Sequence, residues 1–210
     1  RHLMVRVLLA TGISLRVGGL SVGLACIVGA ILGMLAGYLG GLMDAIVMRV
    51  VDALLALPFV VLGIAIVAAI GRSFFNIIFV LGFTGWITFA KLVRGQVLSL
   101  KEDEYIEAAR ALGLSRRRIV LRHALPNAVT PVLITIAFGI AGAILTESTL
   151  TFLSVGVAAE QVTWGSLLNL ARGQASAWWL AVFPGFAIFL SVTVFNLLGE
   201  GLTDALSADS

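Results

Sequence analysis

The densest group of basic side chains in this sequence lies in one stretch, EAARALGLSRRRIVLRHALP, which runs from Glu107 to Pro126. Its arginines suit phosphate or carboxylate partners, because one guanidinium offers several donors to one anion. Gly113 is placed to end a first short helix and Ser115 to cap a second one. Two short helices at an angle would serve a DNA-binding helix-turn-helix, a basic loop on anionic lipid, or a rigid projection that docks on a soluble protein.

A carboxylate also stands inside an apolar stretch, ILTESTLTF, at Glu147. An acidic side chain within a membrane faces either the interior of a helix bundle or a water-filled cavity. Glu147 is therefore a candidate for a transport pathway or a gate. The alternative is a structural carboxylate that is hydrogen-bonded to the neighbouring serine, threonine or backbone groups.

The composition indicates the kind of molecule that must position these groups. Hydrophobic residues make up 60% of the chain and charged residues 12%, and the mean hydropathy is +1.09. Soluble domains contain about 25% charged residues. The chain is therefore predicted to be an all-α polytopic membrane protein. Its one cysteine, Cys26, leaves no disulfide framework or cysteine metal cluster.

Five apolar segments are about as long as the roughly 20 residues that a transmembrane helix needs. They are residues 17–39, 45–70, 76–98, 128–153 and 178–198. We interpret residues 1–210 as one transmembrane domain, with a polar loop at about 99–126 between the third and fourth spans. Pro58 and Pro184 fall inside the second and last spans and can kink them.

The lysines and arginines predict the orientation. Cytoplasmic loops of membrane proteins are rich in these residues, so the loop at 99–126 should face the cytoplasm, together with the turn at 40–44 and the C-terminus. The loop at 156–177 then lies outside. Trp178 and Trp179 suit the outer interface, where indole rings are favoured.

Four glycines in the first span are spaced four residues apart and share nearly one helix face. They are Gly29, Gly33, Gly37 and Gly41. Glycines on one face allow a neighbouring backbone to approach closely, so we expect helix packing there. At the inner end of the second span, Arg49 and Asp52 are three residues apart and are expected to pair.

The basic loop is short and joins two membrane spans, which distinguishes between its possible roles. A DNA-reading helix must be free to enter a major groove, whereas both ends of this loop are held by membrane spans. Docking on a soluble partner is favoured, because Ala108 and Ala109 permit close approach and Glu107 offers a carboxylate to a partner's arginine.

The loop also resembles the EAA loop of ABC-importer permeases. The resemblance rests on Glu107-Ala108-Ala109, on Gly113 and on Leu125-Pro126. The stretches RHALPNAVTP, TESTLTFLSVGV and FPGFAIFLSVTVFNLLGEGLTDAL are similar to the dipeptide, oligopeptide and nickel permeases, and the similarity covers essentially the whole chain. Where the general pattern has isoleucine two residues before Leu-Pro, this chain has His123.

The resemblance implies a type I importer permease of the C-chain type in a prokaryotic cell membrane. Its expected partners are two ABC ATPases, a homologous second permease, an extracytoplasmic solute-binding protein and membrane lipid, without nucleic acid. The residues implied in ATPase coupling are Glu107, Ala108, Ala109, Gly113, His123, Leu125 and Pro126. Family members usually carry another N-terminal span, so one is expected to be missing.

The same resemblance implies a transport subunit rather than an enzyme, with no cofactor of its own. The sequence has no glycine-rich Lys-Ser/Thr loop for nucleotide, so ATP and Mg are expected in the ATPases. A nickel or metal-chelate permease shares the same motifs and remains an alternative for the substrate, although no His-rich tract favours metal. An ion-gradient-driven secondary transporter is the alternative from another class, and it would leave the loop at 99–126 without a role.

Overall fold

The computed structural model describes residues 3–101, 125–158, 161–174 and 176–207. Within these ranges the chain consists of helices joined by turns. The helices are α1 (Leu3–Leu39), α2 (Gly41–Leu55), α3 (Phe59–Ile70), α4 (Phe74–Lys101), α7 (Leu125–Phe152), α8 (Trp164–Arg172) and α9 (Trp179–Ser207). The predicted all-α class is confirmed for this part of the chain.

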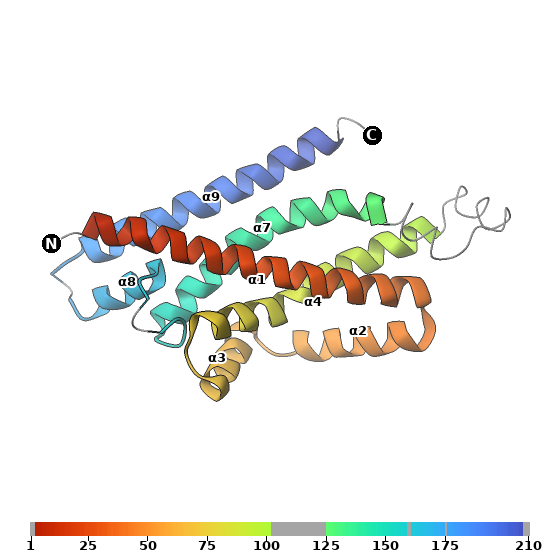
Figure 1. The fold of residues 1–210 in the computed structure, drawn as a ribbon, viewed down its shortest axis with the longest axis horizontal. Coiled ribbons are helices and arrows are strands. Elements are labelled where there is room, and N and C mark those ends of the chain that lie inside the picture. Colours follow the sequence, from red (N-terminus) through yellow and green to blue (C-terminus); the bar gives the residue numbers. More distant parts are fainter. Residues whose placement is uncertain (1–2, 102–124, 159–160, 175, 208–210) are drawn as a thin grey trace.

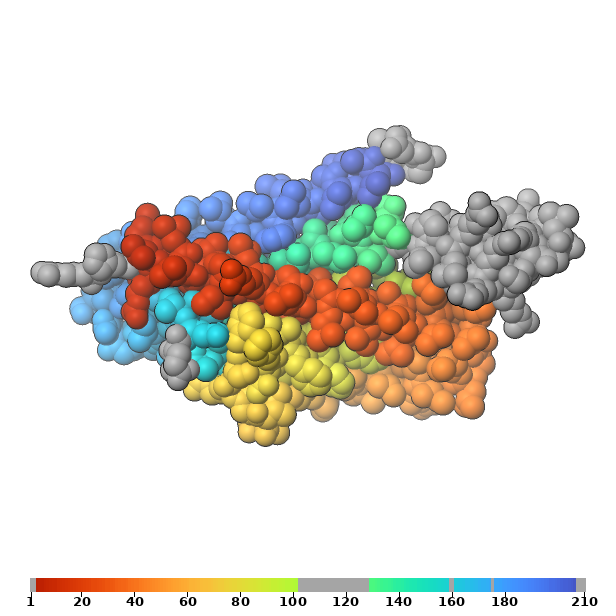
Figure 2. Space-filling view, in the orientation of Figure 1, coloured from red at the N-terminus to blue at the C-terminus, as the bar shows by residue number. Residues whose placement is uncertain are grey.

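Four long helices, α1, α4, α7 and α9, run along the length of an elongated molecule (Figure 1). In the space-filling view α1 crosses one face, α9 forms one edge, and α2 and α3 form the opposite edge (Figure 2). Helix α1 packs most extensively against α4 and also contacts α2, α7, α8 and α9. The first predicted span is therefore the central helix of the bundle.

These four helices are each long and apolar enough to cross a membrane. Large apolar side chains on their outer surfaces are more than half exposed, among them Leu20, Ile27, Phe186, Phe189 and Leu197. So many outward-facing apolar side chains suit contact with lipid or with another membrane protein rather than with water. The bent pair of α2 and α3 supplies the fifth candidate span.

The predicted second span, residues 45–70, is not one helix, which corrects the sequence prediction. Helices α2 and α3 meet at 92° across a break at residues 56–58. Pro58 stands directly before α3 as its N-cap residue. Because a residue that precedes proline avoids helical geometry, the chain leaves the helix at Leu57. Proline therefore breaks the span here rather than kinking it.

The first helix begins at Leu3, well before the predicted start at residue 17. Its 37 residues extend about 55 Å, more than the roughly 30 Å of a bilayer's hydrocarbon core. The extra turns pack against α8 and α9, where Val7 shares a core cluster with Trp164 and Ile188. The indole Nε1 of Trp164 donates to the Val7 carbonyl at 3.2 Å. Contacts with α8 and α9 extend this helix, and the hydropathy of the sequence does not reveal such contacts.

The predicted outer loop at residues 156–177 contains a helix, α8, that the sequence prediction missed. Its N-cap is Thr163, whose Oγ1 accepts a hydrogen bond from the Ser166 amide at 3.2 Å. In return, Ser166 Oγ accepts from the Thr163 amide at 2.9 Å. This is a capping box in which serine replaces the usual Glu or Gln. The three-residue spacing of Thr163 and Ser166 was the feature of the sequence from which the start of α8 could have been predicted.

The turn between α1 and α2 is made by glycine. Gly40 and Gly41 have φ angles of 66° and 54°, in a region that side chains disfavour. The chain reverses there, and α2 runs back beside α1 (Figure 1). This reversal places the first turn of α2 near the end of α4.

Candidate functional site

Most of the segment expected to couple with ATPases lies outside the described residues. The residues outside are Glu107, Ala108, Ala109, Gly113 and His123. Leu125 and Pro126 form the first turn of α7, where proline is tolerated because those amides have no acceptor within the helix. The structure thus shows the two helices that hold the segment, α4 before it and α7 after it, and the roles of its residues stay predictions.

A salt bridge joins α4 to the first turn of α2. Arg94 Nε and Nη2 donate to the two carboxylate oxygens of Asp44 at 2.5 and 2.7 Å. Both side chains are partly shielded, with 29% of Arg94 and 23% of Asp44 exposed. Two parallel hydrogen bonds fix orientation as well as distance, and a carboxylate at a helix N-terminus is also favoured by the helix dipole.

The last residue of α4 makes a second connection to the same turn. Lys101 Nζ donates to the Tyr38 carbonyl at 2.7 Å. The ammonium also lies 5.4 Å from the centre of the Tyr38 ring. Tyr38 is in the last turn of α1, where carbonyls lack partners within the helix and attract cations. The end of α4, which precedes the segment expected to contact ATPases, is therefore attached to both α1 and α2.

The glycine face of α1 lies directly against α4. A Cβ built at Gly29 would lie 2.5 Å from the Trp86 carbonyl oxygen, and one at Gly33 would overlap the Ala90 carbonyl group. At Gly37 it would lie 3.0 Å from the Arg94 carbonyl oxygen. Three glycines thus bring two helix backbones closer than any side chain would allow.

Gly41 does not take part in this contact, although its spacing matches that of the other three. A Cβ at Gly41 would meet nothing within 4 Å, and the residue is the first of α2, where the chain reverses with positive φ. The four-residue period ends where the helix ends, at Leu39. Gly41 therefore contributes to the turn rather than to the packing face.

Arg49 and Asp52 were expected to pair on one face of the second span. In the described part of the chain the salt bridge instead joins Asp44 to Arg94, and both Arg49 and Asp52 are exposed. Residues three apart on one helix can meet, but a partner on a packed neighbouring helix is held in place by the whole bundle. Sequence spacing alone does not reveal such a partner.

Glu147 is completely buried among hydroxyl groups. Thr151 Oγ1 donates to its Oε1 at 2.9 Å, and Ser148 Oγ lies 3.4 Å from its Oε2. The hydroxyls of Ser14 on α1 and Thr163 before α8 also face the carboxylate. A buried carboxylate is tolerated when several donors satisfy it. Glu147 thus connects α1, α7 and the start of α8, which corresponds to the structural alternative left open by the sequence.

The same polar cluster holds the chain that follows α7. Thr151 Oγ1 accepts from the Val157 amide at 3.2 Å, and Ser14 Oγ accepts from the Trp164 amide at 3.4 Å. Gly165 lets the first turn of α8 lie close to the backbone of α7 at Ser148. The cluster therefore organises the end of the molecule that lies away from the end of α4 and the start of α7.

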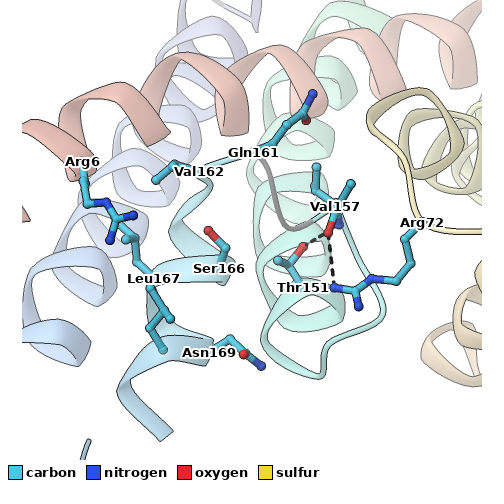
Figure 3. A pocket seen from close by; sticks show the side chains of 11 residues that line it. Arg6, Arg72, Thr151, Val157, Gln161, Val162, Ser166, Leu167 and Asn169 are labelled. Carbon is cyan, nitrogen blue, oxygen red and sulfur yellow. Dashed lines mark hydrogen bonds between the residues drawn. The ribbon is translucent and has the colours of Figure 1, made fainter. Parts of the chain in front are cut away.

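A cavity of about 230 Å³ lies beside this cluster. Figure 3 shows the side chains that line it. Arg6 of α1 and Arg72 of the α3–α4 turn approach it from opposite sides. Arg72 Nη2 donates to the Val157 carbonyl at 3.4 Å. The side-chain amides of Gln161 and Asn169 also line the cavity. The cavity therefore suits a small polar group that can accept hydrogen bonds.

Three comparisons place the chain among known proteins. The dipeptide transport system permease protein of Alkalihalophilus pseudofirmus is 40% identical over 207 residues, which cover 98% of this chain and 68% of that protein. The glutathione transport system permease protein of Pectobacterium atrosepticum is 42% identical over 207 residues, covering 98% and 69%. The solved structure of the MetNI methionine ABC transporter matches with a TM-score of 0.80 at 15% identity, covering 96% of each chain.

The structural match shows a shared fold, that of the type I importer permeases. Residues 29–209 also match the family model described as "Binding-protein-dependent transport system inner membrane component". That range begins at the first glycine of the α1–α4 contact and includes α2, α3, α4, α7, α8 and α9. With relatives more than one third identical along nearly its full length, the chain belongs to the family of binding-protein-dependent transport system inner membrane components.

Proposed function

We propose that this chain is the transmembrane permease subunit of an ATP-driven importer of peptides. The observation that carries the proposal is its similarity, along 98% of its length, to relatives named as dipeptide and glutathione permeases. Glutathione is itself a peptide, so both names share one substrate class. The sequence motifs of the peptide permeases, spread from the loop at 99–126 to the last helix, support the same class.

In this proposal the chain works with two ABC ATPases, a homologous second permease and an extracytoplasmic solute-binding protein. ATP and Mg bind to the ATPases, and this chain binds no cofactor. The loop between α4 and α7 faces the cytoplasm, as its arginines favour. The α1–α2 turn, the end of α4 and the end of α9 lie at one end of the molecule, and α8 lies at the other (Figure 1). This arrangement supports a bundle with one cytoplasmic end and one outer end.

The contacts at the cytoplasmic end supply a mechanism for coupling. When the ATPases close on ATP, they move the coupling segments of the two permeases. The segment departs from α4, which the Asp44–Arg94 and Lys101–Tyr38 contacts join to α2 and α1. The glycine face of α1 packs closely against the backbone of α4. We therefore expect α1, α2 and α4 to move as one rigid body during alternating access.

A crosslink tests the coupling part of the proposal. Cys26 is replaced by serine and a cysteine is introduced at Ala109, in the full complex with its ATPases and in native membranes. A short bifunctional crosslinker should join this cysteine to an ATPase with a yield that changes with ATP. An intact complex that gives no such adduct would contradict the role of the loop.

An uptake assay in proteoliposomes tests the substrate part. A labelled dipeptide should accumulate only with ATP and the solute-binding protein, and an ion gradient should not replace ATP. Uptake of nickel without uptake of peptide would contradict the peptide assignment and establish the metal alternative. Uptake driven by an ion gradient alone would contradict the ATP-driven mechanism.

A further inference from the structure

A second cavity lies at mid-length of the central helices. It has a volume of about 330 Å³ and lies between α1, α4, α7 and the start of α3. Ser21, Thr88 and Gly139 line it, and they lie near the middle of α1, α4 and α7 respectively. Small-molecule sites have volumes of about 300–1,000 Å³. The cavity is therefore large enough for part of a small ligand, and it lies about midway along three of the candidate spans.

One polar group in this cavity has no partner among the described residues. Ser21 is 1% exposed, and its Oγ makes no hydrogen bond there. The hydroxyls of Thr135 and Thr146, which line the same cavity, each donate at 2.8 Å to the carbonyl four residues earlier. A buried hydroxyl without a partner is unfavourable. Ser21 is thus placed to donate to an acceptor that enters the cavity.

The broken span indicates what the open side of the cavity faces. Phe59, the first residue of α3, lines the cavity, so the break at residues 56–58 lies at the same depth. Leu57 in that break is 51% exposed. Irregular backbone at membrane depth is stable only where protein buries it or where it borders a water-filled space. This side therefore belongs to an aqueous path or to a protein contact.

We propose that this cavity is a subsite for an uncharged side chain of the transported peptide, and that the Ser21 hydroxyl donates to a peptide carbonyl. The inference rests on the proposed function. Of the described residues that line the cavity, none is charged, and Leu81, Phe89 and Phe138 supply apolar walls. A charged side chain would lose its hydration without gaining a partner there. The subsite therefore favours peptides with apolar residues and disfavours charged ones.

Gly142 is a position at which a side chain can be added beside the cavity. It lines the cavity, and a Cβ at this position would meet nothing within 4 Å. Gly19 is a matched control, because it is also an exposed helical glycine with open space around it but does not line the cavity. Gly142→Val and Gly19→Val add the same side chain, so the two variants can be compared directly.

The experiment measures ATP-driven uptake of alanyl-alanine and of leucyl-leucine by the complete complex in proteoliposomes. Each variant rate is divided by the wild-type rate for the same peptide, so that the preference of the solute-binding protein cancels. Gly142→Val should lower leucyl-leucine uptake by about tenfold, the effect of one or two unfavourable methyl contacts, and leave alanyl-alanine uptake nearly unchanged. Gly19→Val should leave both unchanged.

Ser21→Ala supplies an independent variant that adds no bulk. Removing the unpartnered hydroxyl should leave the melting temperature of the complex unchanged or higher, while KM for both peptides rises by about fivefold, the value of one hydrogen bond. If Gly142→Val lowers the uptake of both peptides equally, or prevents assembly of the complex, the cavity serves packing against the second permease. Either result would overturn the subsite proposal. Unchanged uptake of both peptides in both cavity variants would also overturn it. Failure of the proposed function is distinguishable, because the wild-type complex would then take up neither peptide.

Discussion

Asp44 and Arg94 lie 50 positions apart in the sequence and form a two-pronged salt bridge between α2 and α4. Together with the contact of Lys101 on the Tyr38 carbonyl, it attaches the end of α4 to the turn between α1 and α2. The segment that follows α4 is the one predicted to contact the ATPases. A motion of that segment can therefore be passed to α1 and α2 through defined polar contacts.

Replacing Asp44 with asparagine should weaken this attachment. Hydrogen bonds to charged groups contribute about 1.5–3 kcal/mol, and the partial exposure of both side chains places this one at the low end. We expect a lower melting temperature of the complex and uptake that falls while ATP hydrolysis continues. Asp52→Asn is the matched control, since Asp52 is an exposed aspartate of the same helix.

The charge-swapped pair Asp44→Arg with Arg94→Asp gives a further check. It should recover part of the uptake that either single change removes, because the two side chains can again pair. Equal loss in the double and single variants would show that the two residues act separately.

Gly33→Ala should destabilise the contact between α1 and α4. The added methyl would overlap the Ala90 carbonyl group, which is backbone and can shift only with its helix. Overpacking of this kind costs about 1–3 kcal/mol. Gly19→Ala on the same helix meets open space and should be neutral or stabilising, because alanine favours helices. Equal melting temperatures for the two variants, measured on purified complex, would argue against the close packing.

Glu147 offers a test that separates a structural role from a gate. Glu147→Gln keeps the size and the acceptor oxygen, so it should retain most stability and uptake. Glu147→Leu removes every acceptor from the surrounding hydroxyls and should lower stability by about 2–3 kcal/mol or more. The melting temperature and the uptake rate should be measured on both variants. A gate would give the opposite pattern, with uptake lost in Glu147→Gln at unchanged melting temperature.

Glu107→Lys should uncouple transport from the ATPases. Reversing the charge of a carboxylate that meets a partner's arginine weakens the contact by more than about tenfold, so uptake should fall although the chain inserts in the membrane normally. Glu200→Lys is the control, because Glu200 is an exposed glutamate in α9 and its replacement changes the charge by the same amount. Normal ATP-driven uptake by the Glu107→Lys complex would rule out this docking contact.

Local features of the sequence were enough for the class of the protein. Segments of about 20 apolar residues predicted the long helices, because the bilayer sets a minimum length that hydropathy reveals. The peptide-permease motifs indicated the family that the comparisons show. The prediction was weaker at the ends of the elements. It missed α8, whose Thr163–Ser166 capping box has serine in the usual Glu position, and it began α1 at residue 17 instead of Leu3.

The sequence by itself therefore determined an all-helical membrane protein of the importer permease family, because hydropathy and motifs are properties of neighbouring residues. Only the tertiary structure decided which groups meet. Arg94 rather than Arg49 carries the salt bridge, three glycines rather than four face α4, and Pro58 turns a predicted kink into a 92° break. These outcomes depend on how distant helices pack, since each contact is set by the position of two whole helices and no local period encodes it.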